Sequence, residues 1–320
     1  MQKIIQTITN ATAIGQPTTL QTLWSGYGSI DRYPLTNAAQ NSVIVKHVRL
    51  PDRSQHPRGW NTNTSHQRKL RSYHVETAWY RDWAARCTND CRIPKSLALE
   101  QAENEFIIVM EDLDDSGFPV RKNHATLADM RLCLRWLAYF HAIFMGATPT
   151  GLWETGTYWH LATRPDELVA MTDEKLKQAA TLLDQTLSNA PFQTLVHGDA
   201  KLANFCFAAD GQSVAAVDFQ YVGGGCGMKD VAYFIGSCLD EQDCERMEAQ
   251  LLEIYFSALR EALMLHRPEI NASEVEAAWQ PLYAVAWTDF YRFLSGWSPG
   301  HWKMHAYSER LAREVIVQLG

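Results

Sequence analysis

The stretch LVHGDAKLANFCFAADGQSVAAVDFQ, residues 195–220, places ionisable and amide side chains between short apolar runs. Short apolar runs of this kind are typical of buried strands, where an unpaired carboxylate is costly. The dipeptide Asp210-Gly211 predicts a tight turn between two such strands. That hairpin brings Asn204 close to Asp218, and the stretch therefore predicts a functional site at the ends of buried strands.

The chemistry of these side chains points to a metal and a base. Amide and carboxylate oxygens that converge on one point suit Mg²⁺, which is usually held by few protein groups together with substrate phosphates. Asn204 and Asp218 are the expected ligands, and Asp199 is left to accept a proton from an attacking hydroxyl. Taken singly, each residue also fits a turn or a strand-end cap. The cost of burying these groups together favours the functional interpretation.

The composition is that of an ordinary globular protein. The 320 residues are 46% hydrophobic and 20% charged, enough for a large core in one domain or two. The net charge of -7 has the wrong sign for a protein whose main partner is nucleic acid or an anionic membrane. The N-terminus MQKIIQTITN lacks the apolar core of a signal peptide, and no run approaches the roughly 18 apolar residues of a spanning helix. With seven cysteines and no CxxC pair, we expect a cytoplasmic protein.

The two parts of the chain differ in their predicted secondary structure. Apolar and β-branched runs predict strands at 18–24, 41–48 and 106–110, with a helix at about 67–86 and a long polar loop at 51–66. Beyond Leu113 the pattern is mainly helical, beginning with a helix capped by Thr126. We therefore expect a small strand-rich unit at 1–112 and a larger helical unit at 113–320, with the ligand in a cleft between them.

The stretch also resembles a known family. His197-Gly198-Asp199-x4-Asn204 followed by Asp218-Phe219-Gln220 is similar to the catalytic loop and metal-binding motif of the aminoglycoside phosphotransferase and choline kinase group. The motif is most similar to the choline-kinase-like or ecdysteroid-kinase-like branch. The resemblance implies an α+β, protein-kinase-like fold with two lobes. The N-lobe would hold a small antiparallel sheet and one key helix, and the C-lobe would be larger and mainly helical.

The resemblance also assigns roles. Asp199 matches the catalytic base, and Asn204 and Asp218 match the Mg²⁺ ligands. His197 matches the histidine that braces the loop. Lys201 matches the lysine that neutralises charge on the phosphoryl group in protein kinases, although a solvated surface lysine fits equally well. A further match is Asp230, in GMKDVAYFI, the aspartate that steadies the catalytic loop from the following helix; a helix N-cap is compatible with that role.

In the N-lobe, the resemblance implies a clamp for the nucleotide. Lys46 is the lone charge in the strand VIVKHV and matches the lysine that holds the phosphates; a lysine at a sheet edge is the alternative. Its expected partner is Glu76, which with Tyr80 matches the Glu-x3-Tyr pattern of the family. Asp82 is the rival partner. We prefer Glu76 because its apolar neighbours point it toward the sheet.

Two backbone segments complete the expected nucleotide site. The glycines Gly26 and Gly28 form the only candidate for a phosphate-covering loop, which lacks the third glycine of protein kinases. The connection FIIVMEDL resembles the hinge at which backbone groups bind adenine. Met110 matches the residue deepest in the nucleotide pocket, and Glu111 and Leu113 follow it in the hinge.

The acceptor is the least defined part. The C-terminal region is dense in aromatic residues, which fit a cage for a quaternary ammonium group, a slot for an apolar alcohol, or helix packing. Asp289 and Trp297 are the candidates for substrate contact. The sequence thus predicts an ATP- and Mg²⁺-dependent kinase of a small-molecule hydroxyl. A nucleotide-binding module with weak or no activity is the alternative.

Overall fold

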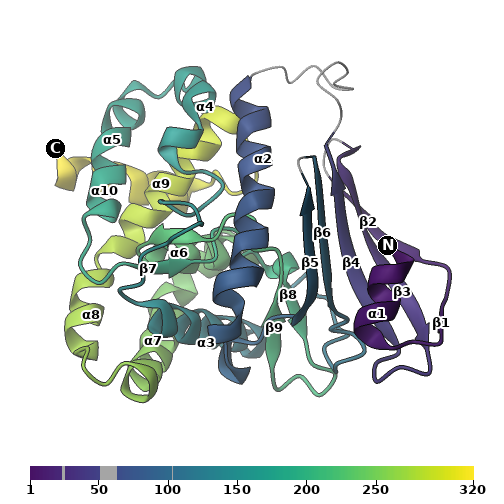
Figure 1. Cartoon of the computed structure of the whole chain (residues 1–320). Helices are drawn as coiled ribbons and strands as arrows, with labels where there is room; N and C mark the ends of the chain where they lie inside the picture. Colours follow the sequence, from purple (N-terminus) through teal and green to yellow (C-terminus); the bar gives the residue numbers. More distant parts are fainter. Residues whose placement is uncertain (24–25, 51–62, 103) are drawn as a thin grey trace.

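An antiparallel sheet and one long helix form the N-terminal part of the chain (Figure 1). The computed structural model describes residues 1–23, 26–50, 63–102 and 104–320. Within these residues the sheet has six strands in the order β1-β3-β4-β6-β5, with β2 paired to β3. The strands are β1 (Ala13–Ile14), β2 (Thr18–Thr22), β3 (Gly28–Thr36), β4 (Ser42–Arg49), β5 (Ser96–Ala102) and β6 (Glu105–Glu111), and the helices are α1 (Gln2–Thr9) and α2 (Asn63–Ala78).

The central strand β4 is covered on both faces, and this decides where Lys46 points. Val45 packs against Ile5 of α1, whereas Val48 packs with Tyr73 of α2. Successive side chains of a strand point to opposite faces, so Lys46 shares the face of Val48 and points toward α2. Burial on both faces also explains why this strand is an almost continuous apolar run.

The helix α2 lies between the sheet and the helical part of the chain (Figure 1). It begins at Asn63, four residues before the predicted start, and continues through a wide turn at Trp79–Trp83 and a tight turn at Ala84–Arg86. The predicted end near residue 86 is therefore confirmed. The predicted loop at 51–66 lies outside the described residues as far as residue 62.

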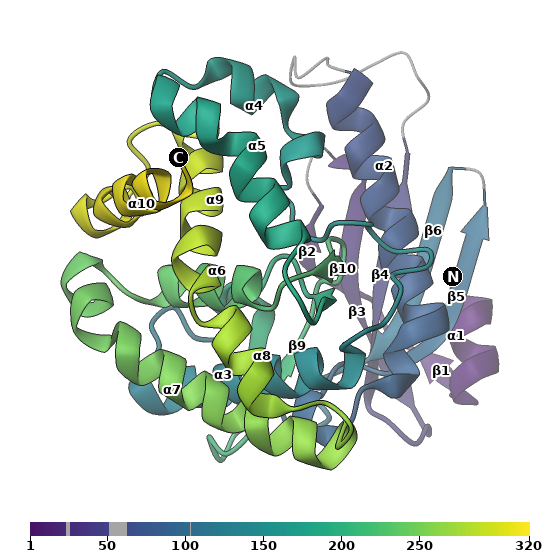
Figure 2. The ribbon, with the colours of Figure 1, turned by 90° about the vertical axis from the view of Figure 1, so that its left-hand side faces the viewer.

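The C-terminal part is mainly helical, as predicted, and faces the viewer in Figure 2 with the sheet behind it. Thr126 caps its first helix through a reciprocal pair of hydrogen bonds with Asp129, which confirms the predicted start. The helices are α3 (Leu127–Phe144), α4 (Pro165–Ala170), α5 (Glu174–Ser188), α6 (Met228–Cys238), α7 (Glu241–His266), α8 (Ala272–Trp279), α9 (Leu282–Trp297) and α10 (Ala306–Leu319). Among the described helices, none is long and apolar enough to cross a bilayer.

Four short strands interrupt the helices and hold the stretch that opened the sequence analysis. They are β7 (Thr194–Val196), β8 (Phe205–Phe207), β9 (Val214–Ala216) and β10 (Gly223–Gly225). Strands β8 and β9 form the predicted hairpin, with Phe205 opposite Ala216, and β7 pairs with β10. The polar loop of residues 197–204 thus begins after β7 of one pair and ends before β8 of the other.

The connection between the two parts follows β6. Asp112 accepts hydrogen bonds from Arg32 of β3 and Ser42 of β4, so the connection is tied to the sheet. The two-lobed α+β architecture is confirmed. A boundary at residues 112 and 113 stays a prediction.

Candidate active site

The loop that follows β7 depends on a glycine. Gly198 has a φ of +80°, and a Cβ atom at this position would lie 2.1 Å from the backbone oxygen of Tyr221. No side chain fits there, because the conformation favours glycine and the neighbouring backbone leaves no space. The loop therefore passes close to the segment that follows Asp218, which brings the two motifs of the sequence together.

Asp230 of α6 holds this loop through hydrogen bonds to its backbone. Its side chain is fully buried, and its carboxylate accepts hydrogen bonds from the backbone N–H groups of His197 (2.6 Å) and Gly198 (2.9 Å). It also accepts one from Nε2 of His141, whose Nδ1 atom lies 2.9 Å from the Tyr255 hydroxyl. The sequence analysis predicted that Asp230 supports the loop, but it gave no role to His141.

His197 braces the loop from within. Its Nδ1 atom accepts a hydrogen bond from the backbone N–H of Asp199 (3.2 Å), which leaves the proton on Nε2, and Nε2 donates to the backbone oxygen of Val217 (3.0 Å). The ring is fully buried and lies 4.7 Å from the ring of Phe219. A buried imidazole with both nitrogens in hydrogen bonds to the backbone is suited to position the loop.

Asp199 is buried and surrounded by donors. Its Oδ1 atom accepts a hydrogen bond from the Tyr233 hydroxyl, and its Oδ2 atom accepts from Lys201 Nζ and Asn204 Nδ2, each at 3.0 Å. Burial raises the pKa of Asp199, and the Lys201 ammonium opposes this shift without cancelling it. A carboxylate with a raised pKa is better suited to accept a proton than an exposed one.

Asn204 and Asp218 are brought together by the hairpin, as predicted. The backbone N–H of Val217, the residue before Asp218, donates to the backbone oxygen of Asn204 at 3.0 Å. Asp218 has a φ of 72°, a conformation that is uncommon for residues other than glycine and that is often found at functional sites. Burial acts to raise the pKa of Asp218, but Lys46, Lys69 and Lys201 outweigh it and keep that pKa below its usual value.

The donor set fits a magnesium ion. Oδ1 of Asp218 is buried and accepts no hydrogen bond within the described part of the chain. Asn204 donates through Nδ2, so its oxygen Oδ1 is not used in these bonds. The described ranges contain no group of three His, Cys, Asp or Glu side chains placed for a metal. A cation here would therefore be held by few protein oxygens and by substrate phosphates, as is usual for Mg²⁺.

Lys46 and Glu76 form the predicted buried ion pair. Lys46 Nζ lies 2.6 Å from Oε2 of Glu76 and 3.6 Å from Oδ1 of Asp218. The rival partner Asp82 is exposed and pairs with Arg81. Burial acts to lower the pKa of Lys46, but the carboxylates of Glu76 and Asp218 together outweigh it, so this pKa is raised and the ammonium stays charged. The pair thus places one positive charge beside the carboxylate of Asp218.

The sequence analysis missed a second lysine at this site. Lys69 of α2 donates from Nζ to Oε1 of Gln220 at 2.9 Å, and Ser72 Oγ donates to the same oxygen at 3.3 Å. Burial, followed by the charge of Lys46, lowers the pKa of Lys69 to about 8. The spacing of Lys69 along the helix could have indicated this position, because residues 69, 72 and 76 share one face of a helix. The helix α2 thus contacts the residue that follows Asp218-Phe219.

Gly26 precedes β3, and Gly28 is the first residue of that strand. The backbone N–H of Gly26 donates to the backbone oxygen of Leu23 at 3.1 Å. A Cβ atom on Gly28 would lie 1.9 Å from the backbone oxygen of His47, so this glycine is needed for strand packing. Ser25, directly before Gly26, lies outside the described residues. A phosphate contact of Gly26 and Gly28 stays a prediction.

The expected hinge lies at the end of β6. Met110 is buried in the main core, and Leu113 is buried with its backbone oxygen accepting from Phe118 N–H at 2.8 Å. The carboxylate of Glu111 points to Arg92 and to the backbone N–H of Lys95, so this side chain has a structural partner. Contacts of Met110, Glu111 and Leu113 with adenine stay predictions.

The two predicted acceptor residues differ in exposure. Asp289 is 1% exposed, and its carboxylate accepts hydrogen bonds from Trp159 (3.0 Å) and Arg292 (2.9 Å). This carboxylate is used inside the C-lobe, and we do not propose it for the acceptor. Trp297 is 42% exposed and stacks on Phe293, with ring centroids 5.4 Å apart. Contact of Trp297 with a substrate stays a prediction.

Comparison with known proteins gives the family of this chain. The model of the ecdysteroid kinase-like family matches residues 72–148 and 155–267, over half of the chain. Choline kinase from Cryptosporidium parvum Iowa II is 8% identical over 95% of this chain and 88% of that one, with a TM-score of 0.51. A choline/ethanolamine kinase family protein from Mesorhizobium loti is 13% identical over 95% of this chain and 88% of that one, with a TM-score of 0.47.

A comparison with curated proteins gave no match. The likeness to choline kinase shows the fold, and the match to the family model covers the end of α2 from residue 72, the loop that carries Asp199 and the hairpin that brings Asn204 to Asp218. The chain belongs to the ecdysteroid kinase-like family, and it is a phosphotransferase of the small-molecule kinase class that acts on hydroxyl groups.

Proposed function

We propose that this protein transfers the γ-phosphoryl group of ATP, in the presence of Mg²⁺, to a hydroxyl group of a small molecule. The observation that supports this most strongly is the convergence of charged groups from both lobes. Lys46 Nζ lies 3.6 Å from Asp218 Oδ1, while Asn204 Nδ2 lies 3.0 Å from Asp199 Oδ2. The proposed base, the proposed metal ligands and the proposed phosphate-binding lysine thus lie in one site, because Val217, next to Asp218, is hydrogen-bonded to Asn204 through the backbone.

At the nucleotide end, cations of the chain would bind the phosphates. Lys46, held by Glu76, is oriented toward the phosphates, and Lys69 adds a second positive charge from α2. Asp218 and Asn204 would hold Mg²⁺, which when bound neutralises phosphate charge. We propose that the backbone of Gly26 and Gly28 also contacts the phosphates. The backbone of the segment Met110–Leu113 would bind the adenine.

At the acceptor end, Asp199 would act as the base. The acceptor oxygen gives its proton to the Asp199 carboxylate and forms a bond to the γ-phosphorus, while the bond from that phosphorus to the β,γ-bridging oxygen breaks and ADP leaves with that oxygen. The Tyr233 hydroxyl and Asn204 Nδ2 orient the carboxylate. Lys201, 3.0 Å from Asp199, is placed to offset negative charge on the phosphoryl group.

A screen of hydroxyl compounds tests this function. Purified protein is incubated with ATP, Mg²⁺ and one compound at a time, chosen from choline, ethanolamine, amino sugars, sterols and other alcohols. ADP release measures turnover, and mass spectrometry identifies the phosphorylated product. We expect at least one compound to gain a phosphoryl group in the wild-type protein and none in the Asp199→Asn variant. Binding of ATP without transfer to any compound would instead favour an inactive nucleotide-binding module.

A further inference from the structure

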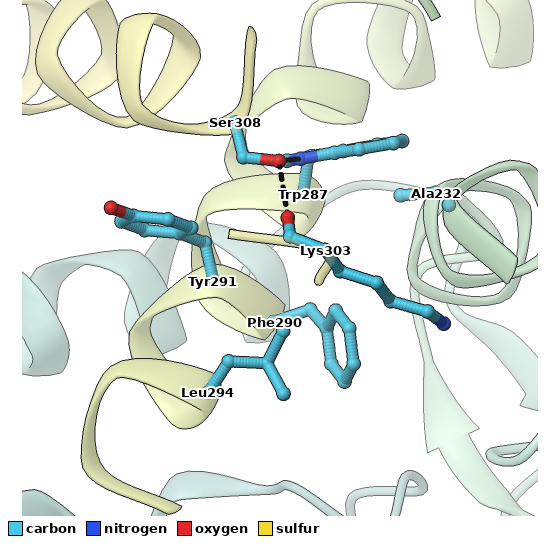
Figure 3. Close-up of a pocket in the computed structure, with 8 residues that line it drawn as sticks. Ala232, Trp287, Phe290, Tyr291, Leu294, Lys303 and Ser308 are labelled. Atoms are coloured by element: carbon cyan, nitrogen blue, oxygen red, sulfur yellow. Dashed lines mark hydrogen bonds between the residues drawn. The ribbon is translucent and has the colours of Figure 1, made fainter. Parts of the chain in front are cut away.

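A lysine in the connection between α9 and α10 points toward the catalytic loop. The backbone oxygen of Lys303 accepts a hydrogen bond from Ser308 Oγ at 2.9 Å, and Ser308 Oγ accepts one from Trp287 Nε1 at 2.9 Å. Figure 3 shows these bonds at one end of Lys303 and its side chain running from them past the ring of Phe290. The backbone of this lysine is therefore fixed, and its ammonium extends past Phe290 of α9 to the ring of Tyr233 of α6.

Three aromatic rings surround the ammonium. Lys303 Nζ lies 4.9 Å from the ring centroid of Tyr233, 5.3 Å from that of Trp302 and 5.4 Å from that of Phe290. Cages of aromatic rings at such distances are how proteins bind ammonium groups of ligands. Here the ammonium in the cage belongs to the protein itself. A cationic group of a substrate would meet a like charge at this place, which is unfavourable.

The cage is connected to the proposed base through one side chain. The ring of Tyr233 forms part of the cage, and its hydroxyl donates to Asp199 Oδ1 at 3.0 Å. A hydroxyl compound that reaches Asp199 would therefore lie beside Tyr233, whose ring contacts the Lys303 ammonium. Among the residues that the structure describes, none gives Lys303 Nζ a hydrogen bond or an ion pair. A partly buried charge without such a partner is well suited to bind an anionic group.

Resting on the proposed function, we propose that Lys303 binds an anionic group of the acceptor. The substrates would then be alcohols that carry a carboxylate or a phosphate, and cationic alcohols such as choline would be rejected. Binding of an anion by Lys303 explains why the three aromatic rings surround an ammonium group of the protein itself. It also separates this chain from an enzyme whose aromatic cage is open to a quaternary ammonium group.

The ionisation of Lys303 gives an independent readout. Burial lowers the pKa of Lys303 to about 8. The groups that face it are the thiols of Cys238 and Cys244, the carboxylate of Asp199, the ammonium of Lys201 and the phenol of Tyr233. The ammonium is charged below this pKa and neutral above it. Binding of an anionic acceptor should therefore weaken as the pH rises through about 8.

The test is a library with equal numbers of anionic, neutral and cationic alcohols, including glycerate, glycerol 3-phosphate, glycerol, ethanolamine and choline. Phosphorylated products are identified by mass spectrometry. We expect the best acceptors of the wild-type protein to be anionic; the carboxylate and phosphate members show which anion is preferred. Lys303→Met should raise the acceptor KM about 10- to 100-fold, with the KM for ATP unchanged. Lys303→Glu should raise the KM for anionic acceptors further and lower the KM for cationic alcohols.

Two variants control for folding and for loss of a lysine. Lys303→Arg keeps the charge, and its acceptor KM should stay constant above pH 8 where that of the wild type rises. Lys175→Met, at an exposed position of α5, should change neither KM. The proposal is overturned if the best acceptors are neutral or cationic, or if Lys303→Met leaves the acceptor KM unchanged. If no alcohol is phosphorylated in an Asp199-dependent manner, the proposed function itself fails, and this inference fails with it.

Discussion

Lys46, in the sheet, and Asp218, after the β8–β9 hairpin of the C-lobe, approach to 3.6 Å between Nζ and Oδ1. The contact joins the two lobes at the place where a nucleotide would bind. Glu76 holds the lysine from α2, so three separate segments determine the geometry. The same place lacks a hydrogen-bond donor to Asp218 Oδ1 within the described ranges. The site thus has a positive charge suited to phosphates and a carboxylate oxygen without a hydrogen bond that is suited to Mg²⁺.

The first prediction concerns the base. Asp199→Asn keeps the size of the side chain but removes the ability to accept a proton. We expect the rate of transfer to fall by about 10²- to 10⁴-fold, the usual contribution of a general base, with the affinity for ATP nearly unchanged. Rapid-quench kinetics and calorimetric titration measure the two quantities. A variant that keeps wild-type turnover would show that Asp199 is not the base.

The second prediction concerns the partner of Lys46. Glu76→Ala leaves a buried ammonium without its main counter-charge, and loss of one member of a buried pair typically costs about 3–5 kcal/mol. We expect a lower free energy of unfolding and a higher KM for ATP. Asp82→Ala removes an exposed carboxylate from the same helical segment and is the matched control. Equal effects of the two substitutions would argue against the buried pair.

The third prediction concerns Lys69. Its pKa of about 8 means that the ammonium is charged below pH 8 and loses its proton as the pH rises above it. The value of kcat/KM for ATP, which reports on the free enzyme, should therefore fall above pH 8. Lys69→Met should lower kcat/KM at pH 7 and remove this dependence on pH, whereas Lys69→Arg should preserve activity at high pH. A pH profile identical in wild type and Lys69→Met would rule out this role.

The fourth prediction concerns the support of the catalytic loop. Asp230→Ala leaves the buried N–H groups of His197 and Gly198 without acceptors, at about 1–3 kcal/mol each. We expect urea unfolding at a lower concentration and a lower kcat. Glu174→Ala, at an exposed position of α5, is the control. Wild-type stability of the Asp230 variant would contradict the role of this carboxylate.

Much of the site could be predicted from the sequence because it is encoded locally. The hairpin turn at Asp210-Gly211, the spacing of Asn204 and Asp218, and the isolated charge of Lys46 in an apolar strand are all short-range patterns. The choice of Glu76 over Asp82 also followed from the apolar residues on its face of the helix. The structure agrees with each of these placements.

Other parts depend on tertiary contacts that the sequence does not reveal. The role of Lys69 depends on how α2 is rotated against Gln220, and that of Tyr233 on the packing of α6 against the catalytic loop. Strand β5 was missed because SLALEQA consists mostly of good helix formers. Strand β3 was missed because GSIDRYPLT contains two charges and a proline and lacks a regular apolar alternation.

The most direct test of the central claim is calorimetric titration of ATP into the wild-type protein and the Asp218→Ala variant, each with Mg²⁺ and with excess EDTA. The account predicts that Mg²⁺ strengthens ATP binding to the wild type by at least tenfold and that the variant loses this gain. Equal affinity of the wild type with and without Mg²⁺, or a full Mg²⁺ effect in Asp218→Ala, would contradict a metal site formed by Asn204 and Asp218.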